Sequence, residues 1–262
     1  MRALSILYHD VVRENFEESG FPGAAAARYK FTEVEFGAHL RRMADKASSA
    51  AVPVDLLFDS TAEARQPFFM TLDDGGSSAV YIAEALERYN WRGHFFVTTN
   101  YIDTPTFVSR EQIRWLRRRG HVVGSHSSSH PFRISEIPSD QLAAEWKDSV
   151  TVLADILGEP VRCASVPGGF YAPRVAEAAA AAGIRALFTS EPTTRVTEVA
   201  GCLVLGRYTV YRGLSAEYAG ELAAGSRVVL TKQQLLWGIK KVLKTATAPL
   251  WDGARKVLFS GK

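Results

Sequence analysis

The feature that most constrains the fold of this chain is a regular alternation of short apolar runs with longer amphipathic ones. The runs typical of strands cover residues 4–10, 68–74, 93–99, 121–126, 162–169 and 184–190. The runs typical of helices cover residues 32–47, 77–90, 109–120, 139–158 and 176–183. Strands that alternate with helices predict a parallel sheet with helices outside it, either open or closed into a barrel.

Two of the expected helices carry signals of how they begin and which face they bury. Ser109 and Gln112 have the spacing of a capping box, in which each side chain bonds the backbone N–H of the other residue. Val34, Leu40 and Met43 follow helical spacing in the run 32–47, so we expect these three side chains to face the core.

Composition narrows the class of protein. A hydrophobic content of 47% with 23% charged residues allows a large core and argues against disorder. The net charge of +3 is too small to indicate a surface for nucleic acid. The two cysteines, Cys163 and Cys202, are too few for a disulfide framework or a thiolate zinc site, so we expect buried thiols.

The ends of the chain bear on its location. The N-terminal run reaches His9 and Asp10 too soon for the apolar part of a secretion signal. No run approaches the roughly 18 apolar residues of a transmembrane helix, so we expect none. The simplest expectation is a cytoplasmic protein, with the membrane surface as an alternative place of action.

Residues 235–262 form a basic amphipathic extension of a domain expected at residues 1–234. Such a segment can pack its apolar face on the domain and leave its lysines in water. It can also lie on an anionic membrane surface. We favour packing and keep peripheral membrane contact as the alternative. The basic residues of the extension include Lys240, Lys241, Lys244, Arg255 and Lys256.

Polar residues collect at the ends of the expected strands. Asp73 and Asp74 end one strand and His126 ends another, with His130 four residues later. His9 ends the first strand. Because catalytic groups of parallel α/β folds gather at the carboxyl ends of strands, these side chains are expected on one rim.

A divalent metal site explains why two carboxylates stand side by side at the end of a strand. Two imidazoles four residues apart share a face over one helical turn. Two histidines and a carboxylate are a common ligand set for such an ion. One aspartate can then bind the cation while the other stays free as a base. Taken alone, either motif is more often part of an ordinary loop or turn, and it is their combination that favours the metal site.

At these residues the sequence resembles the polysaccharide deacetylases, the NodB-homology group of carbohydrate esterase family 4. Residues 71–76 (TLDDGG) look like the first motif of that family, and residues 126–130 (HSSSH) look like the second. Residues 166–169 (VPGG) resemble the core of the third, and residues 6–12 (ILYHDVV) are similar to the opening strand. The resemblance runs from about Leu4 to Ser190, in consistent order and spacing.

The resemblance implies a distorted (β/α)7-type barrel of mainly parallel strands with outer helices, which hydrolyses an N-acetyl or O-acetyl group on a sugar. It implies that Asp73 is the general base. It implies that Asp74, His126 and His130 bind a divalent ion, most often zinc, with cobalt or nickel as alternatives. By position, the backbone N–H of Gly168 would complete the oxyanion site.

Two positions depart from the family pattern. The arginine of the third motif, which orients the base, falls at Ser165, whose side chain has neither the charge nor the planar fork. Arg162, Arg174 and Arg207 are the candidates to replace it. The late histidine that serves as general acid has no counterpart, because all six histidines lie at or before His130.

His9 is the candidate for the missing acid, since it is the remaining histidine at a strand end. A packed histidine under the rim is the alternative interpretation. Phe170 and Tyr171 follow the third motif and are candidates to stack on a sugar ring, although core packing is the commoner role of aromatic residues.

We therefore expect a metal-dependent hydrolase that removes an acetyl group from a saccharide or a lipid-linked glycan precursor, in glycan or exopolysaccharide biosynthesis. A hydrolase of a non-sugar amide or ester on the same scaffold is the first alternative. A degenerate carbohydrate-binding relative without turnover is the second.

Overall fold

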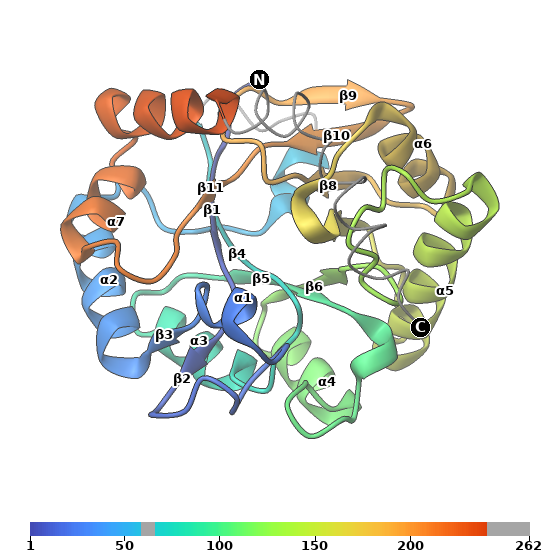
Figure 1. The fold of residues 1–262 in the computed structure, drawn as a ribbon, viewed down its shortest axis with the longest axis horizontal. Coiled ribbons are helices and arrows are strands. Elements are labelled where there is room, and N and C mark those ends of the chain that lie inside the picture. The colour runs from blue at the N-terminus through green and yellow to red at the C-terminus, as the bar shows by residue number, and fades with distance from the viewer. Residues whose placement is uncertain (59–65, 240–262) are drawn as a thin grey trace, which may run out of the picture.

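The computed structural model describes residues 1–58 and 66–239, and one large sheet organises them (Figure 1). Its strands are β1 (Leu4–Tyr8), β4 (Phe68–Leu72), β5 (Gly93–Val97), β6 (Val122–Ser125), β7 (Cys163–Ser165), β8 (Ala186–Phe188), β9 (Thr197–Val199), β10 (Cys202–Leu205) and β11 (Tyr208–Thr209). They lie in the order β11-β1-β4-β5-β6-β7-β8-β10-β9. All neighbouring pairs are parallel except β10 with β9, so the carboxyl ends of eight strands meet at one edge.

Helices cover the outside of the curled sheet (Figure 1). They are α1 (Ala24–Ala27), α2 (Glu33–Lys46), α3 (Ala79–Glu87), α4 (Arg110–Arg118), α5 (Ser139–Leu157), α6 (Pro173–Ala181) and α7 (Ala216–Ala223), followed by a helical segment at residues 227–239. Three 3₁₀ turns are η1 (Val54–Phe58), η2 (Thr99–Tyr101) and η3 (Pro167–Gly169). A small parallel pair, β2 (Val11–Val12) and β3 (Phe31–Thr32), lies beside α2.

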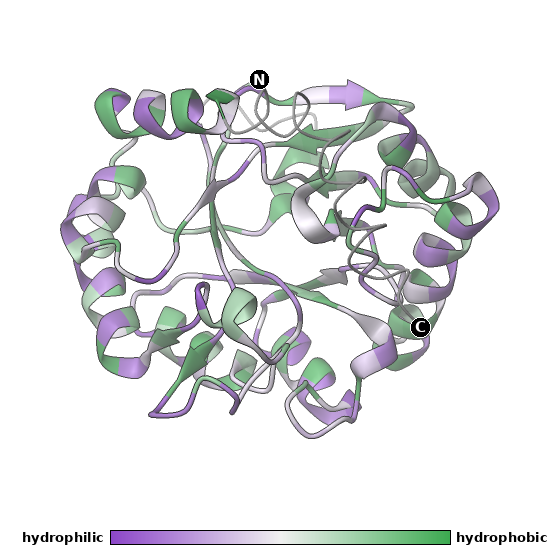
Figure 2. Ribbon diagram, viewed as in Figure 1, coloured by the Kyte–Doolittle hydropathy of each residue, from purple (hydrophilic) through white to green (hydrophobic). Residues whose placement is uncertain are grey.

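Both faces of the sheet are buried, as is usual for parallel strands covered by helices. Along β4 the side chains alternate, so that Phe68 and Met70 pack toward the helices while Phe69 points into the curl. There Phe69 meets Phe188 from β8, with ring centroids 6.0 Å apart. Figure 2 shows hydrophobic residues along these strands, whereas the helices carry both hydrophobic and hydrophilic residues. Apolar packing therefore fills the inside of the curl and leaves the rim for polar groups.

The expected helix signals hold in the structure with one exception. Ser109 and Gln112 form the capping box at the start of α4. Leu40 and Met43 are buried on α2, but the prediction for Val34 is wrong, because 82% of its side chain is exposed. The buried stripe of α2 instead runs from Phe36 through Leu40 to Met43, and Val34 lies two residues before Phe36, on the opposite face.

The predicted fold class is confirmed: a mainly parallel sheet curls into a partial barrel surrounded by helices. Cys163 and Cys202 are free, buried thiols, as expected. Within residues 1–58 and 66–239, no helix is long and apolar enough to cross a membrane. The helix at 227–239 crosses the boundary expected at residue 234, and the rest of the basic extension, residues 240–262, lies outside the described residues.

Candidate metal centre and active site

The residues of the first two motifs meet at the carboxyl edge of the sheet. Asp73 and Asp74 directly follow β4, and the N–H of Asp73 still bonds the carbonyl of Tyr8 in β1 at 3.1 Å. His126 directly follows β6, and its N–H bonds the carbonyl of Val97 in β5 at 2.9 Å. Because the ladder continues into these residues, their side chains are fixed at the rim by strand geometry.

Asp74, His126 and His130 converge on one point. A ligand atom from each lies within 4.8 Å of the others. Oδ1 of Asp74 lies 3.4 Å from Nε2 of His126 and 3.5 Å from Nε2 of His130. Ligands about 2.05 Å from a tetrahedral zinc ion lie about 3.3 Å apart, so these spacings fit such an ion.

The loop from His126 to His130 brings its two imidazoles together without a helical turn. The residues between β6 and His130 have no helical assignment. Instead Ser127 and His130 have positive φ angles of 64° and 59°, and the two rings lie 5.0 Å apart between centroids. The expectation of a shared helical face is therefore wrong in its local geometry. Asp74 also has a positive φ, of 76°, and such backbone strain is typical of functional sites.

The carboxylate of Asp73 is held by a guanidinium group that comes from outside the third motif. Nη1 and Nη2 of Arg207 donate to its two carboxylate oxygens at 2.6 and 2.8 Å. Arg207 is completely buried and follows β10, and its Nε donates to the carbonyl of Thr189 at 2.9 Å. Of the three candidate arginines, Arg207 thus contacts the predicted base.

Ser165 links the predicted base to a predicted ligand. Its hydroxyl donates to Oδ1 of Asp73 at 3.0 Å. Nδ1 of His126 lies 3.1 Å from the carbonyl oxygen of Ser165 and 2.5 Å from its Oγ. Because Nδ1 faces these acceptors, it carries the ring hydrogen and leaves Nε2 with a free lone pair toward Asp74.

The electrostatics of the site keep both carboxylates ionised. Burial raises the pKa of Asp73, but Arg207 and His126 outweigh it and hold that pKa below its usual value. Burial likewise opposes ionisation of Asp74, but a hydrogen bond from His126, when that ring is protonated, and the neighbouring imidazoles depress the pKa of Asp74 well below the ordinary range. Two anionic groups with imidazole neighbours create a place where a cation is stabilised.

The surroundings shift the pKa values of His126 and His130 in opposite directions. Burial lowers the pKa of His130 to about 4, so its ring is neutral near pH 7 and can act as a ligand. Burial also lowers the pKa of His126, but the charges of Asp73 and Asp74 exceed that effect and raise it. A proton on His126 therefore competes with a metal ion for the same position.

One wall of the site is aromatic and is tied to the domain by a buried lysine. The ring of Phe21 lies 4.8 Å from that of His130, between centroids, and packs on Tyr101 and Phe107. Nζ of Lys30 donates to the carbonyl oxygen of Phe21 at 2.7 Å, and Lys30 is 1% exposed. This wall could not be predicted from the sequence, because the segment that contains Phe21 and Lys30 carries no motif that would place it at the rim.

The structure also places His9 at this rim. It lies close enough to Asp73, Asp74 and His130 to interact with them electrostatically, and its ring lies 4.7 Å from that of Tyr29. Its Nδ1 is buried and has no hydrogen-bond partner among the described residues. It lines a small cavity of about 10 Å³ with Asp73, room for about one water molecule.

The third-motif turn lies against the loop that follows His130. Gly168 has φ 64°, and a Cβ built on it would come within 2.3 Å of the carbonyl oxygen of Phe132. Only glycine therefore fits this turn without a shift. Phe170 packs on Phe132 with ring centroids 5.4 Å apart, and Tyr171 is partly buried against the core.

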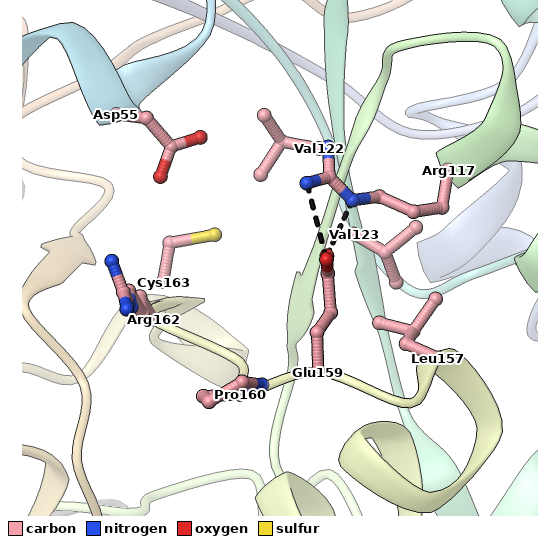
Figure 3. Close-up of a pocket in the computed structure, with 9 residues that line it drawn as sticks. All are labelled: Asp55, Arg117, Val122, Val123, Leu157, Glu159, Pro160, Arg162 and Cys163. Atoms are coloured by element: carbon pink, nitrogen blue, oxygen red, sulfur yellow. Dashed lines mark hydrogen bonds and ion pairs between the residues drawn. The ribbon is translucent and has the colours of Figure 1, made fainter.

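A separate cavity of about 210 Å³ lies at the opposite, amino end of the strands (Figure 3). Arg117 and Glu159 form an ion pair in it, and Cys163 from the start of β7 lines it. Burial raises the pKa of the Cys163 thiol, which removes the thiolate needed of a nucleophile. Of the residues predicted for the site, the candidate arginine Arg162 lines this cavity, whereas Asp73, Asp74, His126 and His130 do not, so the candidate chemistry belongs to the other end of the sheet.

Comparisons with known proteins agree with the motifs. Residues 61–187 match the profile of the polysaccharide deacetylase family. The putative polysaccharide deacetylase YxkH of Bacillus subtilis (strain 168) is 23% identical over 190 residues, which cover 71% of this chain and 67% of YxkH. The peptidoglycan-N-acetylglucosamine deacetylase PgdA of Listeria monocytogenes is 30% identical over 115 residues, which cover 43% of this chain and 22% of PgdA. The chain thus spans about two thirds of one relative and less than a quarter of the other.

A solved structure shows the same fold. The Streptococcus pyogenes deacetylase PplD, in complex with acetate, aligns with a TM-score of 0.68 at 19% identity, over 83% of this chain and 96% of PplD. At that identity the likeness concerns the fold alone. The family match over residues 61–187, the named relatives and the shared fold together confirm the resemblance seen in the sequence, which is to the polysaccharide deacetylase family of hydrolases.

Proposed function

We propose that this protein is a metal-dependent hydrolase that removes an acetyl group from a saccharide. One observation carries the proposal: Asp74, His126 and His130 place three ligand atoms within 4.8 Å of one another, beside a second aspartate that is oriented by Arg207. The family match supports the deacetylation of a polysaccharide. PplD, whose fold is similar, was solved with acetate, the product of such a reaction.

Asp74, His126 and His130 would hold the cation, with zinc favoured by two imidazoles and one carboxylate. When bound, a divalent ion lowers the pKa of water and polarises the acetyl carbonyl. Asp73 lies with Oδ2 3.8 Å from Nε2 of His126, close enough to share the site. We assign Asp73 the role of the base that accepts the proton of the attacking water.

Arg207 and Ser165 would orient that base. Their three hydrogen bonds fix the plane of the Asp73 carboxylate, which leaves its remaining lone pairs as the proton acceptor. His9 would give a proton to the departing amine or hydroxyl, since its unpartnered Nδ1 lies at the same rim. The backbone N–H of Gly168 would stabilise the oxyanion, and Phe170 and Tyr171 would contact the sugar.

Acetate release by metal-loaded protein tests the proposal. The chain, stripped of metal and loaded with zinc or cobalt, should release acetate from acetylated oligosaccharides. Asp73→Asn should lower the rate about 10²–10⁴-fold and keep the metal, because Asp73 is assigned to proton transfer. His126→Ala should lose both metal and activity, whereas Asp103→Asn, at an exposed carboxylate, should lose neither.

Three results would point elsewhere. Metal binding without release of acetate from any acetylated sugar would favour a carbohydrate-binding relative without turnover. Release from small amides or esters alone would favour the non-sugar hydrolase. Full activity of the His126→Ala variant would remove the metal site from the account.

The cytoplasmic location and the role in exopolysaccharide biosynthesis stay predictions, which fractionation and polymer analysis of producing cells would test.

A further inference from the structure

The helical segment at residues 227–239 has an apolar face that the rest of the described protein does not cover. It carries four of the eight exposed large apolar side chains in the described ranges. Their exposed fractions are 77% for Val228, 64% for Leu235, 47% for Leu236 and 58% for Ile239. These residues follow helical spacing and form one stripe, which we call the open face.

The opposite face of the same helix is firmly attached to the domain. Val229 and Leu230 pack against the main core. Nε2 of Gln233 donates to the carbonyl of Thr209 at 3.1 Å, and Nε2 of Gln234 donates to Oη of Tyr208 at 2.9 Å. The helix (red in Figure 1) is thus held in place by one side, and among the described residues nothing covers the other side.

Basic residues accompany the apolar stripe. Arg227 and Lys232 line a shallow groove with Val228, Leu235 and Leu236. In the sequence, no acidic residue occurs between Glu221 and Asp252, whereas five basic ones do. Apolar side chains interleaved with cations are typical of helices that lie in the interface of an anionic bilayer.

Charge also argues against the two other possible occupants of the open face, which are a second copy of the protein and residues 240–262. A second copy would bring the same basic residues against Arg227 and Lys232. The sequence of residues 240–262 holds six basic residues and one acidic residue, so that segment would add positive charge to a positive face. An anionic lipid surface is the occupant that satisfies both the apolar stripe and the cations.

We propose that the open face docks the protein on a membrane surface rich in anionic lipid. The docked helix would lie next to the candidate active site, because a Cβ built on Gly169 of the third-motif turn would be 3.8 Å from the ring of Trp237. Docking through this helix would bring the candidate active site close to the membrane surface. This inference does not depend on the deacetylation reaction, and its test needs no substrate.

Flotation of the full chain with lipid vesicles tests the docking. The protein should float with vesicles that contain phosphatidylglycerol and not with vesicles of phosphatidylcholine alone, and high salt should release it. Leu235→Glu with Leu236→Glu should lower the bound fraction at least about tenfold, since two apolar contacts become anions. Lys232→Gln should lower it about fivefold. Val34→Glu, at an apolar residue of α2 that is more exposed than either leucine, is the matched control and should float like the parent.

Both leucines are exposed, so the paired variant should keep the melting temperature and the zinc affinity of the parent protein. Flotation that persists in this variant would overturn the proposal, because lipid contact would then lie elsewhere. A full chain that never floats would also overturn it. In that case a dimer that the paired variant dissociates, seen by light scattering, would assign the face to a second copy, and a monomer would assign it to residues 240–262.

Discussion

Asp73 is positioned by two side chains that come from distant parts of the sequence. Ser165, at the position where the resemblance implies an orienting arginine, supplies a single hydroxyl hydrogen bond. Arg207 supplies the charge and the two parallel bonds from the segment after β10. The same task is therefore divided between a short polar side chain and a long buried one.

Replacement of Arg207 by lysine tests this division. Lysine keeps the charge but cannot form two parallel bonds to a carboxylate. We expect the turnover number to fall about 10–100-fold, since misorientation of a catalytic group by about 1 Å costs that much. The acid limb of the pH–rate profile should move to higher pH, because Arg207 helps to hold down the pKa of Asp73.

Zinc content should not change in the Arg207→Lys variant, because Arg207 contacts none of the three ligands. Arg162→Lys, in the cavity at the other end of the sheet, is the matched control and should leave the profile unchanged. A profile identical to the parent's in Arg207→Lys would show that Asp73 is not the group that the acid limb reports.

His9 gives a second prediction at this scale. A general acid matters most when the leaving group is a poor one, such as an amine. We expect His9→Asn to lower release of acetate from an N-acetyl sugar about 10²-fold and to affect an activated acetyl ester much less. Parallel kinetics on an amide and an ester substrate measure the difference, and equal losses on both would assign His9 to packing instead.

The convergence of the three candidate ligands could be predicted from the sequence, and their surroundings could not. Asp74, His126 and His130 lie in short motifs whose spacing, placed at strand ends, implies a shared rim. Arg207 lies 133 residues after Asp74 in a segment without a recognisable motif, so only its burial against a carboxylate reveals it. The carbonyl contacts of Lys30 likewise depend on the path of a loop, which side-chain patterns do not encode.

At the scale of elements, the η3 turn packs closely against the loop that follows His130. Gly168 has φ 64°, and a Cβ would meet the carbonyl oxygen of Phe132 at 2.3 Å. Gly158, which ends α5, has a similar φ of 71° but nothing within 4 Å of a built Cβ. The two glycines share a backbone conformation and differ in their neighbours.

Alanine at each glycine separates these effects. Gly158→Ala should cost about 1–2 kcal/mol of unfolding free energy, the penalty of a left-handed backbone. Gly168→Ala should cost about 1–3 kcal/mol more and lower turnover, because the turn must move away from Phe132. Urea unfolding and acetate release measure both quantities. Equal unfolding costs would mean that the turn yields easily and does not fix the site.

The order of elements could be predicted well because periodicity reports burial directly. The strands that precede Asp73 and His126 and the helices between them lie where their patterns indicated. Val34 shows one limit of prediction from periodicity: it lies at the start of the helix, fits the helical spacing only loosely and points to solvent. The loop 126–130 shows a second limit, because its two residues with left-handed backbone replace the helical turn that the spacing suggested.

At the scale of the whole molecule, a buried histidine links stability to pH. His94 on β5 accepts from the N–H of Val54 and bonds the carbonyl of Met70, and burial lowers its pKa from 6.5 to about 4. The unfolded chain therefore binds more protons than the folded one between these pH values. Stability that is complete above pH 6.5 is lost as the pH falls toward 4.

We expect this histidine to contribute a loss of roughly 3 kcal/mol over that range. His94→Gln, which can keep both hydrogen bonds, should flatten the slope of unfolding free energy against pH by up to about one proton. Urea unfolding of the metal-free protein at several pH values measures the slope. Parallel slopes in parent and variant would show that His94 is already protonated in the folded state or titrates alike in both states.

The central claim is that one cation binds where two strands end. Anomalous diffraction at the zinc edge, from crystals grown with zinc, tests it most directly. The account predicts a single strong peak within coordination distance of Oδ1 of Asp74 and of both Nε2 atoms of His126 and His130, with Asp73 still paired to Arg207 and outside the coordination shell. A peak elsewhere, or no peak at this rim at saturating zinc, would contradict it.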